Sequence, residues 1–252
     1  MPERKNSSAT TTAERDAGGF AAAARRAGQM EYDWNFAIVW DYRAVLLRGL
    51  LYTVMLAAIT IVTSMILGLA LALLRGSKVP FVYPVISTMI SVVRAVPVLV
   101  LLVWMYYCLP IITGLKLEGF TTVVIALSIY SSAFFAEIFR GGIQSIDRGH
   151  IEAAQSVGMT RGQVFQRIVA PLAFQRIFPP LVNQCILVLK NTTLAGYVAV
   201  PELLYLGQQI SVRTFRPLEL LTVVAVLFVV TIVPLTLAAE YFEKKYREKY
   251  FR

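Results

Sequence analysis

The chain has 252 residues, of which 57% are apolar and only 15% are charged, and its formal net charge is +9. Soluble domains average about 45–50% apolar and 25% charged residues, so this composition excludes a soluble enzyme, a disordered regulator and a disulfide-stapled secreted domain. The basic residues lie beside apolar runs and form no arginine-rich stripe with aromatic residues, which indicates membrane topology and not nucleic-acid binding.

The first 30 residues are rich in Ala, Ser, Thr, Gly and Arg, and they contain no apolar run of signal-peptide length. A segment with so few large apolar residues cannot bury a core, so residues 1–30 are predicted to be a disordered tail. Residues 31–48 are expected to form a juxtamembrane segment that leads to the first span.

Five apolar segments follow, and each is long enough to cross a bilayer, for which a helix needs about 20 apolar residues. The second segment contains Arg94 and has Pro80 and Pro110 near its ends, so we expect one long tilted span and not two. The expected spans are residues 49–74, 81–109, 119–136, 177–200 and 220–239, within one membrane domain over residues 49–240.

Lysine and arginine residues gather on one predicted side of this domain. That side holds the polar loop of residues 141–176 and the basic C-terminal tail of residues 241–252. Because cytoplasmic loops carry an excess of Lys and Arg, this side is predicted to be cytoplasmic. The N-terminus then lies outside, and the basic tail lies at the anionic inner leaflet.

The polar loop of residues 141–176 is predicted to contain two short helices. Asp147 is a suitable cap for a first short helix that contains residues 151–156, and Gly158 can end that helix in a left-handed conformation. A T-x-x-Q capping box at Thr160 predicts the start of the second helix.

The second short helix is predicted to have an apolar face formed by Val164, Phe165 and Ile168, and Pro171 is expected to limit it. A small amphipathic helix outside the bilayer often docks in the groove of a partner protein. It can equally lie on the membrane surface, and these features alone do not choose between the two.

The loop resembles the EAA loop of ABC-importer permeases. The matching residues are Glu152-Ala153-Ala154, then Gly158, Ile168 and Pro171, and the one departure is Ala170 where the pattern has Leu. Segments over roughly residues 45 to 245 are similar to the polar amino acid family of these permeases: 94–97, 106–110, 136–146, 179–180, 190–194 and 201–203. The opening segment 30–34 resembles the glutamate/aspartate branch.

The resemblance implies an all-α, type I ABC-importer permease with about five transmembrane helices in the bacterial inner (plasma) membrane. Its protein partners would be two copies of an ATP-binding subunit, a second permease copy or paralogue, and a periplasmic or extracellular solute-binding protein. Its substrate would be a polar amino acid, with glutamate or aspartate slightly favoured. It would also contact membrane lipid. The ATPase-coupling residues would be Glu152, Ala153, Ala154, Gly158, Met159, Thr160 and Phe165.

The chain has no G-x-x-x-x-G-K-[ST] motif, so it cannot hold ATP in the manner of a phosphate loop. It also has no metal or nucleophile motif, and we expect no enzymatic activity and no cofactor on this chain. ATP and Mg would be bound by the partner ATPase. The alternative is a secondary amino acid transporter that is not driven by ATP, although five spans give no clean inverted repeat.

The fourth span is interrupted by Lys190, Asn191, Thr192 and Thr193. An ammonium inside the bilayer costs about 2.5–3.5 kcal/mol and must face protein or water. We interpret the cluster as part of the substrate path, where it would contact the carboxylate or polar groups of the substrate. The alternative is a buried ion pair between Lys190 and an acid such as Glu137.

Five other polar residues are considered for a structural or a functional role. Glu137 and Arg140 are three residues apart, which favours a local ion pair. Arg94 interrupts an apolar segment and has a structural or gating role by resemblance. Glu202 is expected in an external loop, where it contacts a binding protein or is simply solvated, and His150 is expected to be a solvated loop residue.

Overall fold

The computed structural model describes residues 32–77 and 79–250, and every regular element within them is a helix. The predicted disordered tail, residues 1–30, lies outside the described residues. The elements are α2 (Ala37–Asp41), α3 (Arg43–Arg75), α4 (Val82–Ala95), α5 (Val98–Tyr107), α6 (Leu109–Thr113), α7 (Gly119–Gln144), α8 (Arg148–Ser156), α9 (Arg161–Val164), the π-helix η1 (Phe165–Val169), α10 (Ala170–Asn191), the 3-10 helix η2 (Thr192–Val198), α11 (Leu203–Thr214) and α12 (Pro217–Tyr250).

Four of the described helical stretches are long and apolar enough to cross a membrane, or five when one bent pair of helices is taken as a single span. The predicted all-α class with about five spans is therefore confirmed. The spans are longer than expected at several ends, since α3 begins at Arg43 and α12 continues to Tyr250.

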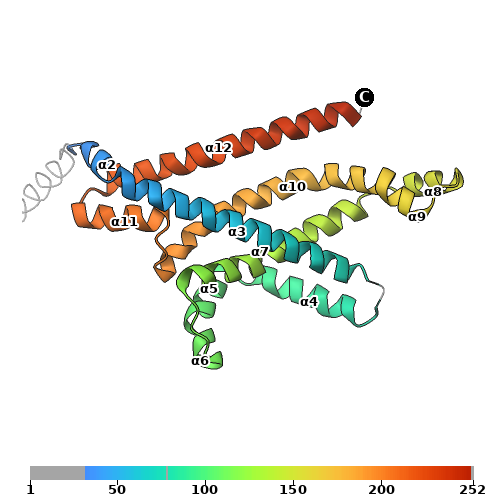
Figure 1. Ribbon diagram of the computed structural model, residues 1–252, viewed down its shortest axis with the longest axis horizontal. Coiled ribbons are helices and arrows are strands. Elements are labelled where there is room, and N and C mark those ends of the chain that lie inside the picture. The colour runs from blue at the N-terminus through green and yellow to red at the C-terminus, as the bar shows by residue number, and fades with distance from the viewer. Residues whose placement is uncertain (1–31, 78, 251–252) are drawn as a thin grey trace, which may run out of the picture. The chain divides into compact units, whose positions relative to one another are not determined.

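Helices α3 and α7 form the central pair of the fold, and they run side by side in Figure 1. Gly68 of α3 lies against the backbone of α7, and Thr60 and Ser64 on α3 are also buried. Such small-residue faces are the usual means by which membrane helices gain van der Waals contact. Phe135 of α7 is fully buried against this face.

The second predicted span, for which one long tilted span was expected, is bent into two helical arms. Helices α4 and α5–α6 meet at an angle of 97°. The break falls at Pro97, which has no backbone N–H to donate, and the preceding Val96 is extended with ψ 130°. Proline disfavours a helical conformation in the residue before it, so the sequence Val96-Pro97 ends α4.

The fourth span is continuous with the second short helix of the loop, which corrects the expectation that Pro171 limits that helix. Helices α9, η1 and α10 follow one another without a break from Arg161 to Asn191. Pro171 lies in the first turn of α10, and the π-helical turn before it absorbs the change in register. Pro179 and Pro180 are likewise inside α10, where a span beginning near residue 177 was expected.

Helices α11 and α12 close the other end of the described bundle against α3 (Figure 1). Leu203 and Ile210 of α11 pack with Leu46 of α3 and with Leu220 and Val224 of α12. This apolar cluster fixes the segment that follows α10 relative to the first and last spans.

Candidate functional site

The predicted caps of the polar loop are present. The Asp147 carboxylate accepts a hydrogen bond from the Gly149 N–H at 2.9 Å and begins α8. The Thr160 N–H donates to the Gln163 side-chain oxygen at 2.9 Å, and the Gln163 N–H donates back to the Thr160 hydroxyl at 3.4 Å. These caps satisfy N–H groups that the first turns of both helices leave free.

Gly158 has the left-handed conformation that the sequence predicts, with φ +82°. Its N–H donates to the Gln155 carbonyl, and the next N–H, from Met159, donates to the Ala154 carbonyl. A Cβ at position 158 would have no heavy atom within 4 Å, so backbone conformation and not space requires glycine there. The glycine sets the angle between α8 and α9.

The two helices of the loop present one exposed and one buried face. Glu152 and Ala153 are exposed, whereas Ala154 is buried with Ile146 and Val164. Met159 packs at the edge of the same cluster. The loop is therefore held on α7 and α10, and its Glu-Ala surface points away from them.

Phe165 belongs to π-helix η1 and lies apart from the exposed surface that Glu152 and Ala153 form on α8. Its ring borders an apolar groove, and its side chain remains 55% exposed. Helices α9, η1 and α10 are continuous, so the second short helix of the loop and α10 form one helical stretch. About 30 residues separate Arg161 from Asn191, or roughly 45 Å of helix. The loop is thus mechanically joined to the polar cluster at the far end of α10.

Glu137 of α7 is the centre of an ion cluster that joins three helices. It pairs with Arg140 one turn later, at 2.6 Å, as the sequence predicts. It also pairs with Arg75 of α3, and the Arg94 guanidinium lies 3.7 Å away. These last two contacts were not predicted, because a single sequence shows only that charges lie at the ends of neighbouring spans. The alternative pairing of Lys190 with Glu137 is wrong, because Glu137 is engaged by arginines.

The predicted path residues lie where α10 ends and the 3-10 helix η2 begins (Figure 1). Lys190 is exposed, and no acid within the described residues pairs with it. Asn191 and Thr193 are half-buried. Thr192 is fully buried and its hydroxyl donates to the Leu189 carbonyl at 2.7 Å, so its side chain is not available on this surface.

A polar pocket of about 430 Å³ adjoins this cluster. Thr193 lines it, together with residues of η2 and α11: Leu194, Gly196, Tyr197, Glu202, Leu204 and Gln208. A pocket of this size is within the range of about 300–1,000 Å³ that small-molecule sites occupy. The pocket therefore places a polar cavity beside the predicted path.

Glu202 is fully buried, so the expectation of a solvated charge is wrong. Its carboxylate caps α11 by accepting hydrogen bonds from the N–H groups of Leu204, at 2.9 Å, and Tyr205, at 2.6 Å. Glu202 lies between the fourth and fifth candidate spans. Burial raises its pKa to about 7, although the hydrogen bonds from the two N–H groups lower the pKa. The cap joins residues within three positions of one another, whereas the burial follows from tertiary packing that a single sequence does not reveal.

The sequence of this chain is similar to those of known transport proteins. The model of the family described as "Binding-protein-dependent transport system inner membrane component" matches residues 64–248. The chain is 33% identical over 216 residues to the probable glutamine ABC transporter permease protein GlnM of Bacillus subtilis (strain 168), covering 86% of this chain and 100% of that one. It is 30% identical over 217 residues to the glutamine transport system permease protein GlnP of Escherichia coli (strain K12), covering 86% and 98%.

Solved structures of ABC transporters share the fold of this chain. A crystal structure of an amino acid ABC transporter with histidines superimposes with a TM-score of 0.79 at 30% identity, and the match covers 84% of this chain and 99% of that one. An inward-facing structure of the MetNI methionine ABC transporter shares the fold, with a TM-score of 0.68 at 21% identity over 82% of this chain and 98% of that one. Both matches cover nearly the whole of the related chain.

Proposed function

The chain belongs to the family of binding-protein-dependent transport system inner membrane components, and from this premise we propose that it is the membrane-spanning permease subunit of an ATP-driven importer of polar amino acids. The observation that carries the proposal is the unbroken helix from Arg161 to Asn191, which connects the capped loop to the polar cluster. This connection allows an event at the loop to change the conformation of the substrate path.

We propose that the loop docks in an ATPase subunit through Glu152, Ala153 and the neighbouring exposed residues, and that Ala154, Gly158 and Thr160 fix the shape of the docking element. Two copies of this ATPase would bind ATP and Mg, and this chain would hold neither. The exposed surface of α8 and the buried position of Ala154 support this division of roles. Docking in a groove is the common use of a small helix held outside a bilayer.

In this proposal the loop and the C-terminus are cytoplasmic, and the N-terminus lies outside the inner membrane. The support is the excess of Lys and Arg on the loop side. The opposite end, with Lys190, the polar pocket and α11, then faces the solute-binding protein. A second permease copy or a paralogue would complete the path, since the exposed Lys190 has no acid partner among the described residues.

We propose a polar amino acid of the glutamine type as the substrate. The relatives named above carry glutamine in their names, and they favour it over the glutamate or aspartate that residues 30–34 suggested. Lys190 would contact the α-carboxylate, which all amino acids share. Asn191 and Thr193 would contact polar atoms, with Thr192 behind them as a structural residue.

The test is uptake by proteoliposomes that contain this chain, the ATPase subunit and the binding protein encoded with it. We expect accumulation of radiolabelled glutamine that requires internal ATP and persists after an ionophore collapses the proton gradient. Uptake that follows the proton gradient without ATP would contradict the proposal and identify a secondary transporter. Glutamate and arginine as competitors establish the substrate class.

A further inference from the structure

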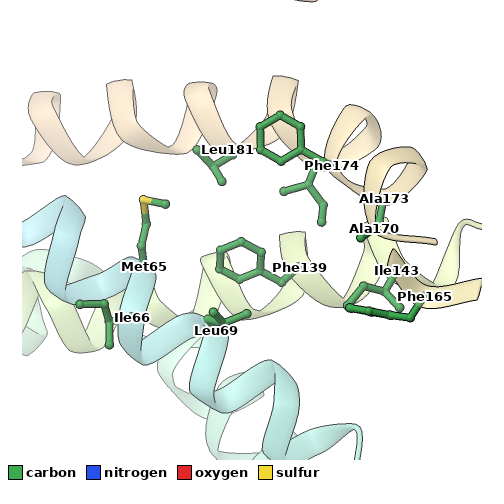
Figure 2. A pocket seen from close by; sticks show the side chains of 11 residues that line it. Met65, Ile66, Leu69, Phe139, Ile143, Phe165, Ala170, Ala173, Phe174 and Leu181 are labelled. Atoms are coloured by element: carbon green, nitrogen blue, oxygen red, sulfur yellow. The ribbon is translucent and has the colours of Figure 1, made fainter. Parts of the chain in front are cut away.

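An apolar groove of about 430 Å³ opens between α3, α7 and α10, close to the coupling loop. Figure 2 shows Phe174 and Leu181 on α10 facing Met65 and Phe139 across the gap. Phe165 and Ala170 border the loop end of the groove, and all of its lining side chains are apolar. This groove is distinct from the polar pocket beside Thr193.

The groove has the length of one membrane leaflet. Along α10 it extends from Ala170 to Leu181, eleven residues or about 16 Å of helix, against about 15 Å for half of the hydrocarbon core. On α3 it ends at Met65, ten residues or about 15 Å before the end of the helix at Arg75. A spanning helix of another subunit would need a contact surface through both leaflets, whereas this groove stops near the middle.

Two cations lie at the loop end of the groove. The Arg176 guanidinium donates a hydrogen bond to the Ser145 carbonyl, which places it at the end of α7, two residues beyond the groove residue Ile143. Arg167 is exposed and lies between Phe165 and Ala170, which both border the groove. Neither arginine forms an ion pair with any acid whose side chain the structure describes.

We propose that the groove binds one acyl chain of an anionic phospholipid from the leaflet on the loop side, with its phosphate held by Arg167 and Arg176. The apolar walls match the acyl chain, the length matches one leaflet, and the unpaired guanidinium groups match the phosphate. The lipid would then lie between the coupling loop and the first span. The choice of leaflet rests on the proposed orientation, with the loop in the cytoplasm.

The test uses tryptophan fluorescence of the full chain in its assembled importer. Trp34, Trp40 and Trp104 are first replaced by Phe, and Phe139→Trp or Ile143→Trp then places a single reporter in the groove. Each protein is reconstituted in phosphatidylcholine vesicles that contain a minor fraction of phosphatidylglycerol or phosphatidylcholine with brominated acyl chains. We expect brominated phosphatidylglycerol to quench the reporter at a severalfold lower mole fraction than brominated phosphatidylcholine.

A second reporter and charge variants make the result specific. Val229→Trp on α12 should be quenched equally by the two lipids, because Val229 is 57% exposed and does not line the groove. Arg167→Gln and Arg176→Gln should each reduce the preference, by about fivefold for each guanidinium removed, whereas Arg213→Gln should not. Arg167→Gln leaves the hydrogen bond to Ser145 intact, so it remains informative if Arg176→Gln disturbs the junction of α7 and α10.

Equal quenching of the groove reporters by both lipids would overturn the proposal. Protection of the reporters from both lipids would also overturn it, because a protein segment such as a second permease copy would then cover the groove. Neither result affects the proposed transport function, which the uptake assay measures separately. If the groove selects the anionic lipid but uptake is not driven by ATP, the proposed lipid site stands and the proposed importer function fails.

Discussion

Gly68 of α3 faces Phe135 of α7 so closely that a Cβ at position 68 would lie 2.6 Å from the Phe135 Cβ and 2.9 Å from the Ser132 carbonyl oxygen. Both neighbours are fixed to the α7 backbone, so neither can move away as a flexible side chain would. The contact is a close approach within the central pair of helices, α3 and α7.

The first prediction concerns this contact. Gly68→Ala should force α3 and α7 apart and destabilise the permease by about 1–3 kcal/mol, the usual range for overpacking a core. Thermal unfolding of the purified protein in detergent measures the effect. Gly76→Ala is the matched control, because a Cβ there would meet only ordinary contacts at 3.4 and 3.5 Å, and its melting temperature should stay close to that of the wild type.

The second prediction concerns the angle between α8 and α9. Gly158→Val places a β-branched side chain at φ +82°, which costs about 1–2 kcal/mol and favours a different loop angle. We expect normal membrane insertion but loss of coupling, measured as uptake and as ATP hydrolysis stimulated by the binding protein. Gly141→Val adds the same side chain in open space at a position that does not have a positive φ, and it should keep both activities. Normal coupling in Gly158→Val would show that the angle is unimportant.

The third prediction separates the residues of the polar cluster. Lys190→Met removes the charge that we propose contacts the substrate. It should reduce uptake by about tenfold or more at equal expression, with a shift in substrate preference, while the ATPase subunit still assembles. Thr192→Val removes a buried hydroxyl that bonds to the Leu189 carbonyl and should lower stability without changing preference. Uptake kinetics of Lys190→Met that match the wild type for every substrate would exclude Lys190 from the path.

The fourth prediction is a pH dependence of stability that comes from Glu202. Its pKa in the folded chain is about 7, above its ordinary value of 4.5, so the folded state binds this proton more tightly than the unfolded state. The stabilising contribution is therefore present at low pH and is lost as pH rises from about 4.5 towards 7, with a total on the order of 3 kcal/mol.

Melting temperatures of the wild type and of Glu202→Gln between pH 5 and about 8 test this dependence. The wild type should lose stability as the pH rises, and the Gln variant should lack that part of the change because its side chain does not titrate. Glu118→Gln changes an exposed residue at the start of α7 and should keep the wild-type profile. A pH profile of Glu202→Gln identical to that of the wild type would rule out Glu202 as the source.

Local sequence patterns predicted the loop well. The cap at Asp147, the capping box at Thr160 and the left-handed Gly158 all involve residues within four positions of one another, and each was confirmed. The apolar runs likewise identified the all-helical membrane class, and the resemblance to ABC-importer permeases of the polar amino acid family is confirmed by the family match and by relatives of at least 30% identity. Such features depend on chain-local hydrogen bonds and on hydrophobicity, which the sequence displays directly.

Proline was a weaker guide, because its effect depends on where a helix begins. Pro97 broke the second span, although the apolar run continues through it, whereas Pro171 lies in a first turn and Pro179 and Pro180 are inside α10. A proline in the first turn loses no hydrogen bond, and neighbouring structure compensates one deeper in a helix. The sequence does not show which of these situations applies.

By itself, then, the sequence determined the membrane class, the caps of the loop and the residue types available for the path, because these depend on neighbours in the chain. Only the tertiary structure decided that Arg75 reaches Glu137 across 62 positions, that Glu202 is buried as the cap of α11, and that Thr192 faces the interior while Lys190 remains exposed. Each of these depends on how α3, α7, α10 and α11 pack against one another. Packing is set by the shapes of many side chains at once, and a one-dimensional pattern does not specify which distant helices will meet.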